Sequence, residues 1–350
     1  MPKPPPKDAP NNTGSVRRPT MAEIARLAGV DTSTVSRALA GSPRVTEETR
    51  ALIDKIVHET GYVVNETARK LRGGRANQIL VIVSDIAAPF YSDVVQGIVE
   101  WFAERSINVL LGVTLRQPKR ESQLAKQLLT GAVDGIITVT GSLPKSIAGL
   151  QDIHRKVVGI SRPIPHEGVT SVVINNYQAA REAMAYLRSR GHERIAYIGG
   201  PTYSQTFRDR CAAYTEVMEE ANVPEHITVR STDTFVYDTD SGFRLMKSIL
   251  NESIRPTAVF CANDELAIGA MAASREAGWK TPEEISFFGF DDLKITEMLS
   301  PPLSTISVPR FEMGRKGAEL LYRQLYENAE PSGRVVLEHR MILRDSVTDV

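Results

Sequence analysis

The residues best suited to contact a partner are five polar side chains near the front of the chain. They are Thr32, Ser33, Thr34, Ser36 and Arg37. Short hydroxyl side chains and a guanidinium at the start of a helix can enter the major groove of DNA and hydrogen-bond to base edges. Polar residues at a helix start also act simply as caps. The elements around these residues must therefore decide between the two interpretations.

A first short helix is predicted just before them. Thr20-Met21-Ala22-Glu23 has the pattern of a capping box, in which the Thr20 hydroxyl and the Glu23 carboxylate each satisfy a backbone amide. Gly29 offers the left-handed conformation that ends a helix. The apolar residues that we expect on its inner face are Ile24, Leu27 and Ala28.

Two more helices complete the pattern. The inner side of the second is formed by Val35, Ala38 and Leu39. The residues left facing outward are Thr32, Ser33, Ser36 and Arg37. Thr46 caps a third helix that Gly61 ends. The expected inner stripe of the third helix is Leu52, Ile53, Ile56 and Val57. The spacing of these three elements predicts a helix-turn-helix.

A weak fourth helix is predicted in the segment 65–76. Its helical stretch ends at Gly73-Gly74, is shorter than an isolated helix needs, and has Leu71 as its only large apolar residue. One interpretation is a hinge that folds on DNA, with Leu71 inserted between base steps in the minor groove. The other is a linker whose leucine packs on the following domain.

The charge is distributed unevenly along the 350 residues. The chain has 42 basic and 42 acidic residues, but residues 1–75 hold 13 Lys and Arg against 8 Asp and Glu. The remaining residues hold 29 against 34, so a basic front precedes an acidic body. This favours contact of the front with a polyanion, although the excess is modest.

The composition is that of a soluble globular protein, with 42% apolar and 24% charged residues. Residues 1–18 contain prolines and lack an apolar core, so we expect a disordered arm and no secretory signal. No apolar run approaches the length of a membrane span. Cys211 and Cys261 lack CxxC spacing, which is consistent with a cytoplasmic protein.

From residue 78 onward, short β-rich runs alternate with amphipathic helices. The expected strands are 79–84, 108–113, 135–140, 156–160, 171–174, 194–199, 228–231, 258–261 and 285–289. Apolar strands that alternate with helices predict parallel sheets covered on both faces. The series is too long for one sheet, so we expect two doubly wound subdomains. Their facing strand ends would form a cleft for a small molecule.

Signals for catalysis or cofactor binding are not found in the sequence. No GxGxxG or Walker loop follows an expected strand, and no GxSxG elbow is present. The six histidines are scattered without metal-ligand spacing. We therefore expect no catalytic residues, no metal and no cofactor, and an enzyme is the disfavoured alternative.

Several motifs together resemble the LacI/GalR family of bacterial repressors. They are Pro19–Ala25, Val30–Leu39, Val45–Arg50, Ala68–Leu71, Arg190–Gly200, Arg255–Asp264, Ile285–Asp292 and Pro301–Ile306. The resemblance is in register over about residues 19–345. Within the family, Ile79–Ile86 and Pro89–Ser92 look most similar to the cytidine-repressor branch.

The resemblance implies a role for each matched position. Thr32, Ser33 and Arg37 match base-reading positions, and Thr20 lies near a phosphate. Leu71 matches a leucine that wedges into the centre of a pseudo-palindromic operator. The positions that match effector contacts are Phe90, Tyr91, Arg210, Tyr237, Asn263 and Asp291. Without the resemblance, Phe90 and Tyr91 could equally be core residues, Arg210 a surface residue and Asp291 a turn residue.

The resemblance implies an all-α helix-turn-helix head followed by an α/β core of two doubly wound parallel-sheet subdomains, as in periplasmic binding proteins. The expected parts are an arm (1–18), a DNA-binding domain (19–64), a hinge (65–76) and an effector-binding and dimerisation core (77–350). The N-subdomain would comprise about 77–175 and 307–335, and the C-subdomain about 176–306 and 336–345.

We expect a cytoplasmic, homodimeric repressor that binds a double-stranded operator and does not associate with a membrane. A sugar or nucleoside effector would control its operator affinity. A periplasmic solute-binding protein is the alternative, but it would have no use for residues 19–75.

Overall fold

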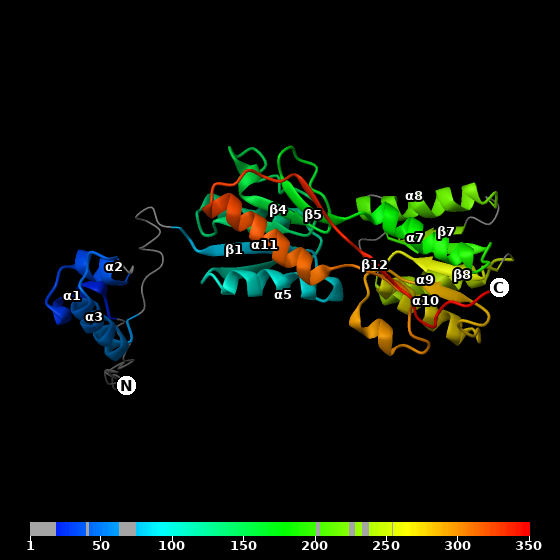
Figure 1. The fold of residues 1–350 in the computed structure, drawn as a ribbon, viewed down its shortest axis with the longest axis horizontal. Helices are drawn as coiled ribbons and strands as arrows, with labels where there is room; N and C mark the ends of the chain where they lie inside the picture. The colour runs from blue at the N-terminus through cyan, green and yellow to red at the C-terminus, as the bar shows by residue number, and fades with distance from the viewer. Residues whose placement is uncertain are drawn as a thin grey trace, which may run out of the picture. The chain divides into compact units, whose positions relative to one another are not determined.

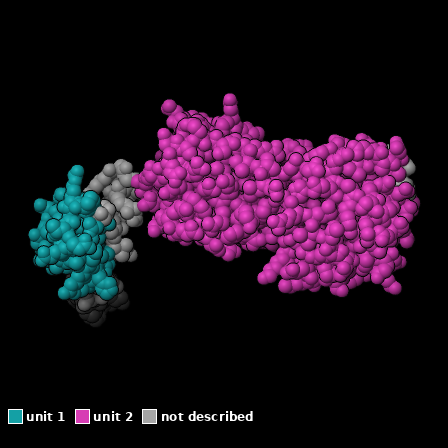
Figure 2. Space-filling view, viewed as in Figure 1, with its two compact units in different colours: residues 1–74 teal, residues 75–350 magenta. Residues whose placement is uncertain are grey.

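The computed structural model describes residues 19–39, 42–62, 75–200, 204–223, 228–232, 238–253 and 255–350. The chain divides into two compact units, residues 1–74 and residues 75–350, which are coloured separately in Figure 2. Each unit is described by itself below. None of the described helices is long and apolar enough to cross a membrane.

The first unit contains α1 (Met21–Ala28), α2 (Thr32–Leu39) and α3 (Glu47–Thr60). The capping box of Thr20 and Glu23 forms, and Gly29 ends α1 with a φ of +64°. Thr46 caps α3, and Gly61 ends it with the same left-handed φ. The apolar centre of the three helices includes Ile24, Val35, Ala38, Ile53 and Tyr62.

Two leucines that were expected inside this unit are instead exposed. Leu27 is 50% exposed and Leu52 is 45% exposed. In α1 the inner face is centred on Ile24, Ala25 and Ala28, so Leu27 lies beside that face. Helices this short bury only a narrow stripe, and small alanines allow them to approach closely.

The second unit begins with a six-stranded parallel sheet in the order β11-β5-β4-β3-β1-β2. Its strands are β1 (Gln78–Val83), β2 (Asn108–Val113), β3 (Gly135–Thr138), β4 (Val157–Ile160), β5 (Thr170–Ile174) and β11 (Arg334–Leu337). Its helices are α5 (Pro89–Ala103), α6 (Pro118–Leu129), η1 (Ile153–Arg155) and α11 (Arg310–Tyr326). We refer to these elements as the N-sheet half.

The alternation along β1 assigns its helices to opposite faces. Ile79, Val81 and Val83 belong to the apolar cluster that contains α5 and α11. Leu80 and Ile82 belong to a second cluster, which the α6 residues Leu124, Ala125 and Leu128 cover. Successive strand residues point to opposite faces, so a sheet buried on both sides reads as a continuous apolar run.

Helices α5 and α11 lie side by side along this sheet (Figure 1). Glycines allow their backbones to touch: a Cβ at Gly97 would lie 2.2 Å from the carbonyl oxygen of Phe311, and a Cβ at Gly314 would lie 2.1 Å from that of Val94. No larger residue fits at either position without moving a helix.

The rest of the second unit is a four-stranded parallel sheet in the order β7-β6-β8-β9. Its strands are β6 (Ile195–Gly199), β7 (Thr228–Ser231), β8 (Ala258–Cys261) and β9 (Ser286–Phe288). Its helices are α7 (Asn176–Ser189), α8 (Gln205–Glu220), α9 (Thr239–Leu250), α10 (Asp264–Glu276) and η3 (Lys294–Met298). Helices α7 and α8 pack as one pair and α9 and α10 as another. We refer to these elements as the C-sheet half.

All nine strands expected from the sequence are present, with ends shifted by at most two residues. Three short strands were missed: β10 (Thr305–Ser307), β11 and β12 (Arg340–Ile342). β10 and β12 pair antiparallel, and β11 extends the six-stranded sheet at its edge. The chain passes between the two halves after β5, after β10 and after β11 (Figure 1). β11 ends two residues after residue 335, where the expected N-subdomain ends.

Candidate functional site

The outward surface of α2 presents the polar residues that the sequence singled out. Thr32, Ser33 and Arg37 are exposed, while Thr34 and Ser36 are half-buried beside the inner residues Val35 and Ala38. Arg37 folds back on the preceding turn: its Nε donates to the Ser33 carbonyl oxygen at 3.1 Å, and its Nη2 donates to the Ser33 hydroxyl at 2.9 Å. A base contact by Arg37 would replace these two solvent-exposed bonds.

Thr20 is exposed and caps α1. Its backbone amide donates to Glu23 Oε2 at 2.8 Å, and its hydroxyl accepts from the Glu23 amide at 3.3 Å. These bonds explain its residue type by local structure alone. Leu71 and most of the expected hinge lie outside the described residues, as does Tyr237.

A cavity of about 460 Å³ lies where the carboxyl ends of the two sheets meet. The N-sheet half contributes residues that follow β1, β2, β3 and β4, such as Asp85, Arg116, Thr140 and Arg162. The C-sheet half contributes residues that follow β6, β8 and β9, such as Ser204, Asn263 and Asp291. Parallel α/β sheets bind ligands at these strand ends. We call this cavity the cleft.

Arg210 on α8 is buried in the cleft wall, with 7% of its surface exposed. Its Nε and Nη2 donate to Asn176 Oδ1 at 3.0 and 2.7 Å, and its Nη1 donates to the carbonyl oxygen of Ala262. The guanidinium lies 3.4 Å from the centroid of the Phe290 ring. These contacts hold a planar donor group at one orientation.

Asp291 is the buried acidic partner of Arg210. Its Oδ1 lies 3.9 Å from Arg210 Nη2, and 6% of the residue is exposed. Burial raises the pKa of Asp291 to about 6, and the Arg210 and Arg310 guanidinium groups oppose that rise. A carboxylate that titrates near neutrality can both accept and donate hydrogen bonds to a ligand.

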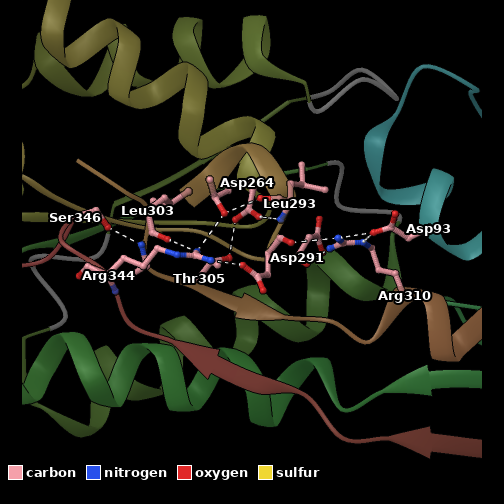
Figure 3. Close-up of polar contacts among 12 residues, drawn as sticks. Asp93, Asp264, Asp291, Leu293, Leu303, Thr305, Arg310, Arg344 and Ser346 are labelled. Carbon is pink, nitrogen blue, oxygen red and sulfur yellow. Dashed lines mark hydrogen bonds and ion pairs between the residues drawn. The ribbon is translucent and has the colours of Figure 1, made fainter. Parts of the chain in front are cut away.

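The backbone around Asp291 is strained and firmly held. Asp291 has a φ of +114° and Asp292 a φ of +55°. Arg310, which begins α11, donates to the carbonyl oxygens of both residues and to Asp93 Oδ2 at 2.8 and 3.0 Å. Figure 3 shows Arg310 between Asp291 and Asp93. Because Asp93 lies on α5, this one guanidinium joins the two halves.

A second buried carboxylate supports the same loop from behind. Asp264 is fully buried; its Oδ2 accepts from the Leu293 amide at 2.8 Å, and its Oδ1 accepts from the Thr305 hydroxyl at 2.6 Å (Figure 3). Burial, reinforced by the nearby Asp291 carboxylate, raises the pKa of Asp264 well above its ordinary value. The sequence reasoning gave Asp264 no role.

The other matched cleft residues come from helix starts. Phe90 and Tyr91 lie in the first turn of α5 and pack edge to face, with ring centroids 5.4 Å apart. Both line the cleft. Asn263 also lines it, but its Oδ1 accepts from the Leu266 amide at 2.9 Å and so caps α10. The structure therefore brings Phe90, Tyr91, Arg210, Asn263 and Asp291 around one cavity.

Several cleft residues escaped the sequence analysis. They include Asp85, Arg116, Glu121, Thr140, Ser142, Arg162, Asp238 and Glu265. Most are polar residues within a few positions of a strand's carboxyl end. That position was a usable signal, because these ends line the ligand crevice in doubly wound sheets. Among the described residues, no group of three or more His, Cys, Asp or Glu is arranged to hold a metal.

Comparison with known families matches both units. Residues 20–65 match the model of bacterial regulatory proteins of the lacI family. Residues 184–347 match the periplasmic binding protein-like domain. The first match spans the described helices α1 to α3, and the second includes most of the C-sheet half.

Two curated relatives match over almost the whole chain. The HTH-type transcriptional repressor CytR of Escherichia coli K12 is 33% identical over 332 residues, which cover 93% of this chain and 96% of CytR. The ribose operon repressor of Haemophilus influenzae is 31% identical over 330 residues, which cover 94% of this chain and 98% of that protein.

Solved structures of regulators are similar to this chain over almost its whole length. The lac repressor dimer bound to operator and the anti-inducer ONPF matches with a TM-score of 0.84 and 25% identity, covering 95% of this chain and all of that chain. The complex of the regulator CelR with cellobiose matches with a TM-score of 0.69 and 29% identity, covering 94% and 100%. These matches favour the regulator over a solute-binding protein, and they confirm the fold class of a helix-turn-helix head with an α/β core. The chain thus belongs to the LacI family of bacterial regulatory proteins, and it is a DNA-binding transcriptional repressor.

Proposed function

We propose that this repressor binds a pseudo-palindromic operator as a homodimer, and that a sugar or nucleoside in the cleft sets its operator affinity. The observation that carries the proposal is the cleft itself, in which a fixed guanidinium, a carboxylate and two aromatic rings surround one cavity of about 460 Å³. Polar groups that fix orientation beside aromatic rings suit a polyhydroxylated or heterocyclic ligand.

The relatives support both operator binding as a dimer and control by a small ligand. One is named a ribose operon repressor, another was solved with cellobiose, and a third was solved as a dimer on its operator with an anti-inducer. Ribose and cellobiose are both sugars. We propose the same ligand class here, extended to nucleosides, and a cytoplasmic location where an operator is accessible.

For the DNA side, we propose that Thr32, Ser33 and Arg37 read base edges. Thr34 and Ser36 would support them, and Thr20 would lie near a phosphate. The exposure of the first three on one surface of α2 supports this assignment. Leu71, outside the described residues, is proposed as the minor-groove wedge of the hinge.

For the cleft, we propose that Arg210 and Asp291 hydrogen-bond the polar groups of the effector and that Phe90 and Tyr91 stack on it. Asn263, at the start of α10, is proposed as a further contact from the cleft wall. Tyr237, outside the described residues, is proposed as a neighbour. The convergence of the described five on one cavity supports this set.

The proposed mechanism transmits cleft closure along α11. At one end of this helix, Arg310 joins the Asp291–Asp292 loop to Asp93 on α5. At the other end, Tyr326 donates to Asp134 Oδ2 at 2.8 Å. The two oxygens of Asp134 also accept from the amides of Ala76 and Asn77, each at 2.7 Å.

Residues 76 and 77 directly follow Arg75, the first residue of the second unit after the DNA-binding unit. A helix of 17 residues spans about 25 Å. It therefore connects the cleft to the entry point of the linker within one rigid element. An effector would shift operator affinity by its differential affinity for two arrangements, typically about 1–3 kcal/mol.

Selection of genomic fragments by the purified full-length chain tests this function. We expect enrichment of a pseudo-palindromic sequence over random competitor DNA, and a change in its retention when ribose, cellobiose, cytidine or adenosine is added. Equal retention of all fragments under every condition would overturn the proposal.

A further inference from the structure

The cleft is lined by carboxylates from both halves. Asp85 follows β1 in the N-sheet half, whereas Asp238, Glu265 and Asp291 come from the C-sheet half, and all four line the same cavity. Glu121 on α6 is a fifth. Among the described lining residues, these five carboxyl groups outnumber the three guanidinium groups of Arg116, Arg162 and Arg210.

The carboxylates of Asp85, Asp238 and Asp291 are close enough to interact electrostatically with that of Glu265. Burial raises the pKa of Glu265 to about 7, and the charges of Asp291, Asp238 and Asp85 add to the rise, while Arg116 opposes it. Burial also disfavours ionisation of Asp238, but hydrogen bonds from Ser241 hold its pKa below the usual value. In the C-sheet half, three lining carboxylates stand against the single guanidinium of Arg210, whereas in the N-sheet half the two lining carboxylates are matched by two guanidinium groups. A ligand in the cleft therefore meets an excess of carboxylates on its C-sheet side.

The guanidinium groups of Arg116 and Arg210 are bound to other groups of the protein. Arg116 Nη2 forms an ion pair with Asp85 Oδ2 at 3.1 Å. Arg210 donates to Asn176 and Ala262 and lies over the Phe290 ring. An incoming phosphate would have to compete with Asp85 for Arg116 and would face Asp238, Glu265 and Asp291 in a partly desolvated space.

Five of the hydrogen-bonding side chains on the cleft walls are carboxylates. Glu121 accepts from the hydroxyls of Thr140 and Ser142 at 2.5 and 3.0 Å, so even this end of the cleft presents a carboxylate surrounded by hydroxyls. Ionised carboxylates only accept hydrogen bonds. Their natural partners are ligand hydroxyl and amino groups.

We propose that the cleft selects an effector without a phosphate or other anionic group, whose hydroxyl or amino groups donate to Asp85, Asp238, Glu265 and Asp291, and that Glu265 is a specificity-determining residue against phosphorylated forms of the same ligand. This rests on the proposed effector function of the cleft. It narrows the ligand class to free sugars and nucleosides, and it excludes sugar phosphates and nucleotides.

Calorimetry of the full-length chain at pH 7 with matched ligand pairs tests the proposal. The pairs are ribose and ribose 5-phosphate, glucose and glucose 6-phosphate, cytidine and cytidine 5′-monophosphate, and adenosine and adenosine 5′-monophosphate. We expect at least one unphosphorylated member to bind at least about tenfold more tightly than its phosphorylated partner, a difference of about 1.4 kcal/mol.

A phosphorylated ligand that binds as tightly as its neutral partner would overturn the proposal, as would a panel in which no neutral member binds. Either result leaves the enrichment of an operator sequence over random competitor DNA unaffected. Failure of ligand selectivity is therefore distinguishable from failure of the regulator function itself.

Glu265→Gln tests the residue directly. In the wild type, affinity for the neutral ligand should rise as the pH increases from 6 to 8, because Glu265 ionises in the presence of Asp85, Asp238, Asp291 and Arg116. The variant should lose most of this dependence and show a phosphate discrimination reduced several-fold.

Glu276→Gln is the matched control, since Glu276 lies on the same helix but pairs with Lys247 at the exposed surface. The control should bind like the wild type. A Glu265→Gln variant with the selectivity and pH profile of the wild type would show that Glu265 does not determine specificity.

Discussion

At the scale of single residues, the two candidate sites are built differently. The α2 side chains are exposed and held only by bonds within their own helix, as Arg37 is by Ser33. In the cleft, Arg210 and Asp291 are buried, and Arg210 is held by Asn176 and Ala262, which are far away in the sequence. A surface that meets many DNA sequences can rearrange, whereas a selective pocket needs preorganised groups.

Arg37→Ala should relax base preference at one half-site position. The guanidinium can form a bidentate contact to a base edge, so its loss should cost about 1–3 kcal/mol at that position. The measurement is operator affinity for a set of single-base variants. Lys55→Ala is the control, because Lys55 is exposed on α3 and pairs with Glu59 on the same helix. A loss that is uniform across all sequences would assign Arg37 to phosphate contact.

Asp291→Asn should abolish the response to effector and keep operator binding. The amide has nearly the shape of the carboxylate but loses its charge beside Arg210. We expect effector affinity to fall by about 1.5–3 kcal/mol, the range for hydrogen bonds to charged groups. Calorimetry with the neutral ligands and operator titration check this. The exposed Asp345→Asn serves as control, and a variant that responds normally would remove Asp291 from the effector site.

At the scale of elements, α11 contacts the cleft loop at one end and Asp134, beside the start of the second unit, at the other. Its first residue, Arg310, holds the Asp291–Asp292 loop, and its last residue, Tyr326, holds Asp134. Between these ends its glycines fit against α5 without space for a Cβ. Close backbone packing makes the two helices move as one body.

Asp134→Asn should uncouple the cleft from DNA. The substitution weakens the acceptors of the Ala76 and Asn77 amides and of the Tyr326 hydroxyl. Effector affinity should stay unchanged, while the effect of the effector on operator affinity should fall from about 1–3 kcal/mol toward zero. Tyr326→Phe should act in the same direction, and Tyr322→Phe, one turn earlier on α11, is the control. Undiminished coupling in both test variants would exclude this route.

Gly314→Ala should destabilise the second unit by about 1–3 kcal/mol through overpacking. The added methyl group would lie 2.1 Å from the carbonyl oxygen of Val94, a backbone atom that cannot turn aside. The midpoint of urea unfolding measures the effect. Gly149→Ala is the matched control, because a Cβ at Gly149 would have no other heavy atom within 4 Å. Equal midpoints would mean that the helices can separate without cost.

At the scale of the whole molecule, buried ionisable groups link stability to pH. His192 is fully buried, with Nδ1 3.0 Å from the Thr257 hydroxyl, and burial lowers its pKa below 6.5. As the pH falls, the His192 imidazole therefore becomes protonated in the unfolded chain before it does in the folded chain. The contribution of His192 to stability is full above about pH 7 and is lost progressively as the pH decreases below 6.5 toward the lowered pKa of the folded state.

Asp291 and Glu265 act in the opposite direction, because their raised pKa values make stability fall as the pH increases. The comparison of wild type with His192→Gln isolates the histidine. Between pH 6.5 and 5, the free energy of unfolding should fall more steeply in the wild type, by up to about 1.4 kcal/mol per pH unit. Parallel curves from urea titrations would contradict this assignment.

The elements with local signals could be predicted from the chain alone. The capping box at Thr20, the left-handed exits at Gly29 and Gly61 and the nine apolar strands depend on neighbours a few residues away. Propensity and periodicity act over that range, so they can be read from the residues in order. The positions of Arg210 and Asp291 came from the family resemblance, since no local pattern marks them.

Other features depend on contacts that form only in the folded chain. β10, β11 and β12 are three or four residues long and exist because distant strands offer them partners. Burial of Ala25 in place of Leu27 depends on how closely the helices approach. The gathering of Asp85, Asp238 and Glu265 around one cleft depends on three separate strand ends and helix starts meeting in space. Such contacts join residues far apart in the chain, and their energies appear only when the whole fold closes the loops between them.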